Sequence, residues 1–309
     1  MAVIEIEGLK KKYRRVRGRS TVALAGLDLA VPAGGVFGFL GPNGAGKTTT
    51  VRCLLGLIRP SSGATRLLGV DTQGHLERVI DRVGSIVETP SLFPGFSGRK
   101  NLELLGRLEG IGSTAVSETL ERVGLGERAD HRVKTYSLGM RQRLGIGAAL
   151  LKDPEVLILD EPANGLDPAG IKEVRDLLRR LGREGRTVFV SSHILGEVRQ
   201  MCDQVAILAR GKCIVAGPVE EVLHDRHEGG FSVKLPDLRR GLEVLQAAGI
   251  EAVFDHGFIS VKLPPDRGAS ITETLAREGL FVSELRPLEA DLETVFLELT
   301  QDPAEEIAR

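Results

Sequence analysis

Residues 41–48 read GPNGAGKT, and this segment constrains the fold of the chain more than any other. It fits the pattern G-x-x-x-x-G-K-[ST], and the apolar run GVFGFL directly before it predicts that a strand leads into the loop. The three glycines allow the backbone to curl so that its N–H groups point inward toward phosphate oxygens. The helix that follows adds partial positive charge at its N-terminus. A strand, a phosphate-binding loop and a helix are therefore expected in this order.

Two side chains of this loop have distinct expected roles. Lys47 is expected to reach the β- and γ-phosphates of a nucleotide, and the Thr48 hydroxyl is expected to ligate Mg²⁺. A plain glycine-rich turn is the alternative, but the chain meets all fixed positions of the pattern in the right context. The residues expected to bind the nucleotide here are Gly41, Pro42, Asn43, Gly44, Ala45, Gly46, Lys47, Thr48 and Thr49.

A second apolar run, VLIL at residues 156–159, ends in two carboxylates. A buried strand that ends in Asp160 places this carboxylate at the carboxyl edge of the sheet, beside the phosphate loop, where it can hold the Mg²⁺ shell. Glu161 comes next and points to the opposite face of the strand end. We expect it to be the general base that orients or deprotonates the attacking water. Many strands end in solvated acids, so this pair is informative only in combination with the phosphate loop.

From residue 1 to about residue 220, short β-branched runs alternate with amphipathic segments, which predicts an α/β fold with a mainly parallel sheet covered on both faces. The segment from about residue 95 to 151 is helical in pattern and predicts a helical subdomain inserted into this core. The expected strands are VIEI, GVFGFL, VLILD, TVFVSS and QVAILA, and the expected helices include Lys47–Leu57, Pro168–Leu181 and Leu195–Met201.

The composition changes near His224, where the polar, glycine-rich segment HDRHEGG predicts a linker. Residues 1–223 are therefore expected to form one domain and residues 230–309 another. The second domain is expected to have the β-α-β-β-α-β order of a ferredoxin-like fold. Its expected elements are FSVKL, the helix Asp237–Ala248, the hairpin EAVFDHGFISVKL, the helix Ala269–Arg277 and the strand LFVSELRP, followed by a last helix, DLETVFLELT.

The overall composition excludes several classes of protein. The formal net charge of -1 gives no general attraction to nucleic acid or acidic membranes. The three cysteines have no CxxC spacing, which favours small core residues in a reducing compartment over a metal site or a disulfide. No secretory signal and no membrane-spanning helix is expected from the apolar pattern. We therefore expect a protein that acts from the cytoplasmic side of any membrane it meets.

The segment YSLGMRQRLGIGAALL, residues 136–151, lies just upstream of the acidic pair. It resembles the LSGGQ signature of the ATP-binding cassette (ABC) ATPases, with Ser137 and Gly139 at matching positions. Ser137 is also a good N-cap for the helix that follows, which is the simpler structural interpretation. The resemblance implies that this helix N-terminus faces a γ-phosphate held by a second subunit, so that ATP is sandwiched in a head-to-tail homodimer. It also implies the cassette fold, with antiparallel strands near the N-terminus.

Three further segments are similar to family motifs and occur in the family's order. GLDP at residues 165–168 resembles the D-loop, which implies that Asp167 lies at the dimer interface. VSSH at residues 190–193 resembles the switch region, which implies that His193 senses the γ-phosphate. Tyr13 stands 28 residues before the phosphate loop, where the family stacks an aromatic ring on adenine. An ordinary tyrosine at a strand end is the alternative.

Three positions depart from the family pattern. Leu138 replaces the first signature glycine and Met140 replaces the glutamine. Glu88, in the segment SIVETP, stands where the family usually has the Q-loop glutamine. The resemblance implies that Glu88 contacts Mg²⁺ or the attacking water and relays to the membrane partner, although a glutamate carries charge in this position.

These departures, together with the ending DLETVFLELT, resemble a bacterial subgroup that powers ABC-2-type exporters, including the daunorubicin- and bacitracin-resistance ATPases. The resemblance implies an Mg-dependent ATPase subunit on the inner face of the cell membrane that drives a separate transmembrane permease, with no specific nucleic-acid partner. The cargo and any ligand of the C-terminal domain are not indicated. Two alternatives stay open: an importer ATPase with a C-terminal regulatory domain, and a soluble ABC ATPase that acts on ribosomes or DNA. The single cassette and the lack of a long heptad insertion make the second alternative less favoured.

Overall fold

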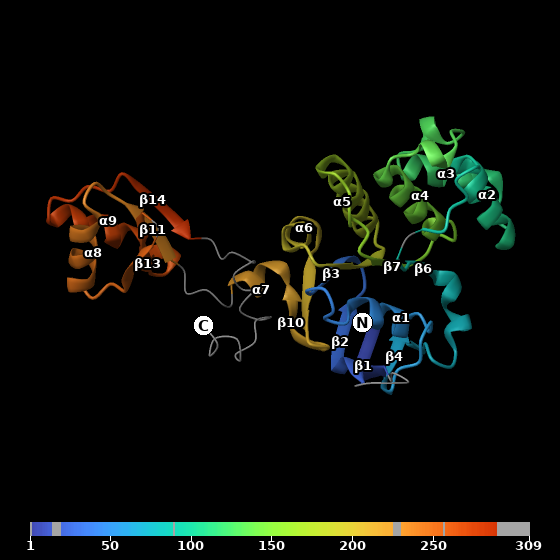
Figure 1. The fold of residues 1–309 in the computed structure, drawn as a ribbon, viewed down its shortest axis with the longest axis horizontal. Coiled ribbons are helices and arrows are strands. Elements are labelled where there is room, and N and C mark those ends of the chain that lie inside the picture. Colours follow the sequence, from blue (N-terminus) through green and yellow to red (C-terminus); the bar gives the residue numbers. More distant parts are fainter. Residues whose placement is uncertain (1, 14–19, 89, 225–229, 256, 289–309) are drawn as a thin grey trace. The chain divides into compact units, whose positions relative to one another are not determined.

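The described chain divides in its sequence between Val219 and Glu220 into two compact units, and each has its own hydrophobic core. Figure 1 shows their helices and strands. The computed structural model describes residues 2–13, 20–88, 90–224, 230–255 and 257–288. In these ranges no helix is long and apolar enough to span a lipid bilayer.

A six-stranded sheet is the centre of the first unit. All neighbouring strands in it run parallel except β9 and β10, which form an antiparallel pair at one edge. Strands β7 and β8 are buried along their whole length. Burial on both faces explains why these two strands read as unbroken apolar runs rather than as alternating patterns. In sheet order the strands are β10 (Lys212–Pro218), β9 (Gln204–Ala209), β3 (Gly35–Leu40), β8 (Thr187–Ser192), β7 (Val156–Asp160) and β6 (Val83–Ile86).

A smaller antiparallel sheet packs into the same core. Its apolar side chains join those of helix α1 (Lys47–Leu54) and of the central sheet in one cluster. In this cluster the rings of Phe39 and Phe189 lie tilted against each other, with 5.3 Å between their centroids. The expected antiparallel strands near the N-terminus are therefore present. In sheet order they are β2 (Thr21–Pro32), β1 (Ala2–Tyr13), β4 (Ser62–Leu67) and β5 (Val70–Asp71).

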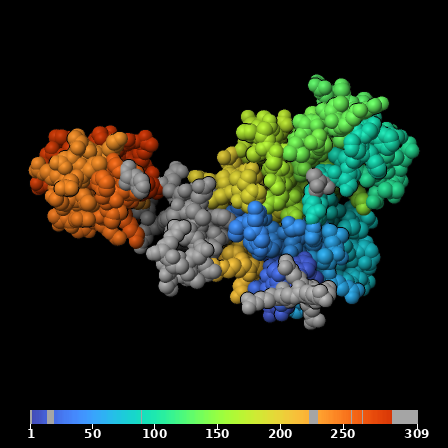
Figure 2. Space-filling model, in the orientation of Figure 1, coloured from blue at the N-terminus to red at the C-terminus, as the bar shows by residue number. Residues whose placement is uncertain are grey.

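Three helices between β6 and β7 form a lobe of the first unit, coloured cyan to green in Figure 2. They are α2 (Gly98–Leu108), α3 (Ser113–Arg122) and α4 (Leu138–Leu150). Side-chain caps start two of them, since the hydroxyls of Ser97 and Ser137 accept backbone N–H groups from the first turns of α2 and α4. Helices α5 (Pro168–Arg183) and α6 (Leu195–Met201) pack together beside β3 and β8.

The second unit begins within the short helix α7 (Val219–His224). Its described elements have the predicted order β-α-β-β-α-β and form a four-stranded, wholly antiparallel sheet in the order β12-β13-β11-β14. Helices α8 and α9 pack together, and their apolar side chains complete the core of this unit. The elements are β11 (Gly230–Lys234), α8 (Leu238–Ala247), β12 (Ala252–Asp255), β13 (Phe258–Lys262), α9 (Gly268–Arg277) and β14 (Glu284–Leu288).

Two predicted elements are shorter than expected. Helix α1 ends at Leu54 rather than Leu57, because Gly56 has a φ of 64° and turns the chain away. The strand expected over LFVSELRP begins only at Glu284. The Ser283 N–H donates to the carbonyl of Lys234, the last residue of β11, so the residues before Ser283 have no strand to pair with. The predicted last helix DLETVFLELT and the body of the predicted linker lie outside the described residues.

Candidate functional site

The phosphate loop runs from the end of β3 to the start of α1. Gly44 and Gly46 have φ angles of 83° and 112°, which glycine adopts at little cost, and the Ala45 N–H donates to the carbonyl of Pro42 at 3.1 Å. The loop is tied to the neighbouring strand because the Gly41 N–H donates to the carbonyl of Ser192 at 3.2 Å. The predicted strand, loop and helix are thus found in the predicted order.

Lys47 crosses back over this loop. Its side chain is only 6 % exposed, and its ammonium group donates to the carbonyl of Gly41 at 2.7 Å. The same ammonium lies 3.1 Å from Oε1 of Glu161. The lysine is therefore held at the place where the loop meets the end of β7.

Glu161 lies between two other groups. While Oε1 faces Lys47, its Oε2 lies 2.7 Å from Nδ1 of His193. The three residues follow β3, β7 and β8, which are neighbours in the sheet and run parallel, so their carboxyl ends meet at one edge. A carboxylate within hydrogen-bonding distance of both an amine and an imidazole can position a water molecule and accept its proton.

The backbone at Glu161 is held in an unusual conformation. Its φ is 51°, in the left-handed region that residues with a side chain seldom adopt. The Glu161 N–H donates to the carbonyl of Ser191 at 3.2 Å and to its hydroxyl at 3.0 Å, and these bonds hold the strained residue in place.

A pocket opens beside these residues. Tyr13, at the end of β1, is 39 % exposed and lines the pocket, with the Lys11 ammonium 5.1 Å from its ring centroid. An aromatic ring at one end and the loop N–H groups at the other suit a nucleotide, which has a planar base and charged phosphates. The lining residues are Tyr13, Thr21, Val22, Ala23, Asn43, Gly44, Gly46, Lys47, Thr48, Thr49, Glu161, Asn164 and His193.

Comparison with known proteins identifies this arrangement. The model of the ABC transporter family matches residues 24–164. An uncharacterized ABC transporter ATP-binding protein, YhcH of Bacillus subtilis, is 40% identical over 97% of both chains. The chain belongs to the ABC transporter ATP-binding proteins. The bacitracin transport ATP-binding protein BcrA of Enterococcus faecalis is 37% identical over 96% of both chains.

A solved structure agrees with the cassette fold. The protein cbiO1 of Clostridium perfringens, described as part of the ABC transporter complex cbiONQ, superposes with a TM-score of 0.63 at 30% identity, over 72% of this chain and 90% of that one. The 72% of the chain that superposes is close to the fraction of its residues that belong to the first unit. As a member of this family the chain is an ATPase that binds ATP.

The chemistry of the site suits a magnesium ion. Mg²⁺ prefers oxygen ligands and usually takes only one or two from the protein, the rest from water and substrate phosphates. The described part of the chain has no cluster of three or more histidine, cysteine or acidic side chains suited to a metal. Thr48 supplies a hydroxyl to the pocket, and the Asp160 carboxylate, 4 % exposed, accepts a hydrogen bond from the Ser191 hydroxyl.

The residues predicted to form the signature and the D-loop do not line the pocket that Lys47 and Glu161 line. Ser137 caps α4, its hydroxyl accepting the Met140 N–H at 3.2 Å, as the sequence predicted. Asp167 caps α5 in the same way. Gly139 packs closely against Gly170 of α5, so the two helix starts lie side by side. Neither helix start lines the pocket.

Glu88 also lies away from the pocket. Its side chain is 62 % exposed, its φ is 67°, and its carboxylate forms an ion pair with Arg52 of α1. The structure therefore links the Q-loop position to the phosphate-loop helix and not to Lys47 or His193.

Among the residues of the site that were not predicted from the sequence are Ser191 and Asn164, and also Thr21, Val22 and Ala23 of β2, which line the pocket. Ser191 joins Asp160 and Glu161 through its hydroxyl, and Asn164 lines the pocket. Ser191 stands within the segment VSSH, but its hydrogen bonds to Asp160 and Glu161 depend on the pairing of β7 with β8. Asn164 directly precedes the segment GLDP.

Proposed function

We propose that this chain is the ATP-hydrolysing subunit of a bacterial ABC-2-type exporter, acting at the cytoplasmic face of the membrane on a separate permease. The observation that carries this proposal is the placement of Glu161 between Lys47 and His193 at the ends of three adjacent strands. The full-length match to a bacitracin transport ATPase and the segments SIVETP and YSLGM favour the exporter subgroup.

Each residue of the site has a distinct role in this proposal. Tyr13 stacks on adenine, and residues 41–49 bind the phosphates, with Lys47 on the β- and γ-phosphates. Glu161 is the general base for the water that attacks the γ-phosphorus, and the bond to the β–γ bridging oxygen breaks. His193 contacts the γ-phosphate and holds Glu161 through its other ring nitrogen.

Thr48 and Asp160 would hold Mg²⁺, with the Glu88 carboxylate contributing after release from Arg52. When bound, the ion neutralises negative charge on the β- and γ-phosphate oxygens. The Ser191 hydroxyl keeps the Asp160 carboxylate turned toward this edge of the sheet, and the same hydroxyl fixes Glu161 through its backbone.

A homodimer completes the site. Ser137 and Gly139 start a helix whose N-terminal N–H groups carry partial positive charge; Ser137 is exposed, Gly139 is buried, and neither lines the pocket of its own chain. In a head-to-tail dimer this helix start would meet the γ-phosphate bound by the partner. Asp167 caps the adjacent helix α5 and would lie at the same interface.

The surface next to the helical lobe suits a permease. Phe93 and Phe96 are half exposed with their rings 5.7 Å apart, and both follow Glu88 in the chain. Beside them is a hollow with apolar walls and a few polar residues, which is typical of protein–protein docking sites. Its lining residues are Pro90, Leu92, Pro94, Val133, Lys134, Leu138, Arg141 and Gln142.

We propose two domains, residues 1–223 and residues 230–309, with the helical subdomain at about 95–151. The strand order of the second unit and its β-α-β-β-α-β succession support a ferredoxin-like fold. In this proposal it is an accessory domain that stabilises the dimer or regulates the ATP cycle.

The test uses Glu161→Gln, which should keep ATP binding, lose turnover and accumulate a closed dimer. The variant is isolated from native membranes with Mg-ATP and its co-purifying proteins are quantified, with Lys47→Ala/Glu161→Gln as the matched control that cannot retain ATP. A multi-helix membrane protein in stoichiometric yield, lost in the control, supports the proposal. Ribosomal or DNA-repair proteins without a membrane partner would overturn it, and a partner encoded with a periplasmic binding protein would select the importer alternative. Normal hydrolysis by Glu161→Gln removes this residue from its role.

A further inference from the structure

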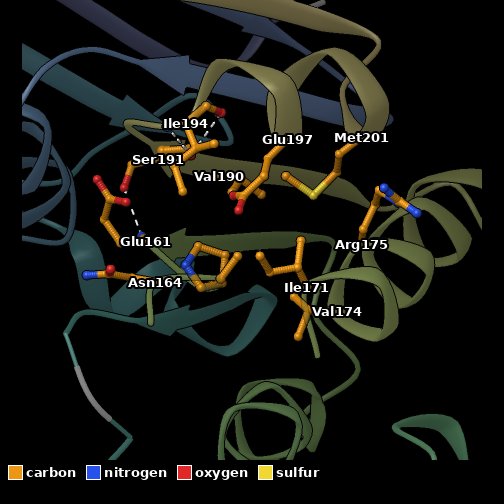
Figure 3. Close-up of a pocket in the computed structure, with 13 residues that line it drawn as sticks. Glu161, Asn164, Ile171, Val174, Arg175, Val190, Ser191, Ile194, Glu197 and Met201 are labelled. Carbon is orange, nitrogen blue, oxygen red and sulfur yellow. Dashed lines mark hydrogen bonds between the residues drawn. The ribbon is translucent and has the colours of Figure 1, made fainter. Parts of the chain in front are cut away.

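Two acidic side chains near the site, Glu197 and Glu88, differ in their access to a bound cation. Figure 3 shows the carboxyl group of Glu197 reaching from α6 into a pocket whose walls are mostly apolar and include Val190 and Met201. Its Oε1 is buried there. The structure describes every residue of the phosphate loop, and none of them lines this pocket. Glu88 follows β6 at the carboxyl edge of the central sheet and is not enclosed in this way, since its side chain is 62 % exposed.

The carboxylate of Glu88 is held on the helix that follows the phosphate loop. Strand β6 runs parallel to β7, and Ile86 pairs with Leu159, so Glu88 follows the edge at which β7 ends. Its Oε1 forms an ion pair with Nη2 of Arg52, in the last turn of α1. Arg52 stands four residues after Thr48, and residues four apart on a helix lie on the same face. The ion pair therefore keeps the carboxylate on a helix face that Thr48 shares.

The segment around Glu88 is anchored on both sides. Glu88 has a φ of 67°, in the left-handed region that residues with a side chain seldom adopt. Two residues later, Pro90 packs on Gly145 of α4, where an added Cβ would lie 2.3 Å from Cγ of Pro90. Two residues earlier, Ile86 is the last residue of β6. Because both neighbours are fixed, Glu88 can change its partner by rotation of its side chain, without a shift of β6 or α4.

The charge of a glutamate at this position suits two alternative cations. A carboxylate forms charge-assisted hydrogen bonds with a guanidinium group, and its oxygens are also ligands that Mg²⁺ prefers. The amide of a glutamine carries no charge and binds a guanidinium group less strongly. Arg52 and an ion held by Thr48 are therefore alternative partners of the Glu88 carboxylate.

We propose that Arg52 is a positioning residue that competes with Mg²⁺ for the Glu88 carboxylate: the ion pair holds the carboxylate away from the nucleotide pocket, and Arg52 gives it up when Mg-ATP is bound. This inference rests on the roles proposed above for Glu88 and Thr48. The glutamate that replaces the family's glutamine is thereby explained, because Arg52 would hold a neutral amide less firmly. Arg52 does not line the nucleotide pocket, so it acts through Glu88.

The test uses the Glu161→Gln protein, which should bind ATP without turnover. The dissociation constant of ATP with a fluorescent label on its ribose is measured with excess Mg²⁺ and again with EDTA. The ratio of the EDTA value to the Mg²⁺ value gives the effect of the ion on binding. Arg52→Gln should raise this ratio about two- to fivefold, because the carboxylate no longer leaves another cation and exposed ion pairs are weak. Glutamine favours a helix about as well as arginine, so α1 should be preserved.

Three further variants decide whether Arg52 acts through Glu88. Arg66→Gln is the matched control, because Arg66 is 36 % exposed against 37 % for Arg52 and pairs with Glu7, and neither Arg66 nor Glu7 lines the nucleotide pocket. Its ratio should stay the same. In a Glu88→Gln background, Arg52→Gln should leave the ratio unchanged, since residues that act through one another are non-additive. Arg52→Lys keeps a cation, and the ion pair uses a single N–O contact, so its ratio should stay within about twofold of the protein with Arg52.

An unchanged ratio in Arg52→Gln, an equal rise in Arg66→Gln, or the same rise in the Glu88→Gln background would each overturn the inference. A ratio in Arg52→Lys as high as in Arg52→Gln would also overturn it, because a positive charge then does not hold the carboxylate. The same experiments test the proposed function separately. If the labelled ATP does not bind, or if Glu161→Gln hydrolyses ATP normally, the proposed function fails whatever the Arg52 variants do.

Discussion

Gly46 ends the phosphate loop, and alanine at this position would place a methyl group where the surrounding backbone leaves no room. An ideally placed Cβ would lie 2.7 Å from the carbonyl oxygen of Ala23 and 2.8 Å from Cδ2 of Leu24. Both contacts are far shorter than van der Waals distance, so β2 or the loop must move. The φ of 112° adds backbone strain of its own for a residue with a side chain. From the close contacts and the backbone strain combined, we expect Gly46→Ala to lower the free energy of unfolding of the first unit by about 3 kcal/mol.

Gly44→Ala is the matched control, because its φ is also positive, at 83°, but an added Cβ would meet no atom within 4 Å. Only the backbone strain applies in Gly44→Ala, and it should lower the free energy of unfolding by about 1 kcal/mol. For a unit of this size the melting temperature should fall by about 6–12 °C in Gly46→Ala and by about 2–4 °C in Gly44→Ala. Circular dichroism melts without nucleotide measure both. An equal or larger fall in Gly44→Ala would refute the packing argument.

Three further predictions concern single side chains. Lys47→Ala should weaken ATP binding by at least about tenfold in equilibrium titrations, since a buried charge on the phosphates is lost; unchanged affinity would contradict our placement of the phosphates. Tyr136→Phe removes the hydroxyl that donates to the Arg128 carbonyl at 2.6 Å and should lower the free energy of unfolding by about 1 kcal/mol in denaturant titrations, whereas no change would show that the bond contributes nothing. Burial raises the pKa of Glu197 in the folded chain, so its contribution to stability is fully present below the pKa of the unfolded chain and is lost as pH rises through the folded value. The Glu197→Gln protein should therefore gain stability relative to the wild type as pH rises above the ordinary pKa of a glutamate, about 4.3, and a difference independent of pH would contradict the buried, titrating carboxyl.

Strands that are buried on both faces were predictable from sequence, and so was the edge at which their polar residues meet. The run VLILD is β7 residue for residue, and TVFVSS is β8, because continuous apolar runs of this length have few other stable environments. Since adjacent parallel strands end at one edge, Lys47, Glu161 and His193 could be expected to converge.

Features that depend on tertiary contacts were not predictable in this way. The strand β4, SGATRL, has little apolar pattern and is a strand only because it pairs with β1. Glu197 looks like an ordinary solvated acid in a first helical turn, and only the packing of α5 and α6 buries its Oε1. The ion pair of Glu88 with Arg52 likewise joins segments whose approach no local pattern indicates.

The strand order of the central sheet has a consequence for protein synthesis. The phosphate loop extends from β3, but the strands that flank β3 in the sheet are β8 and β9, which lie about 150 residues later in the chain. A ribosome that has just completed the loop has made neither neighbour, so the nascent segment has no sheet to join and no partner for Lys47. The antiparallel sheet of β1, β2 and β4 needs only early residues and can form first. Nucleotide binding should therefore arise late in translation, once β9 has left the exit tunnel, and ATP cannot stabilise shorter intermediates.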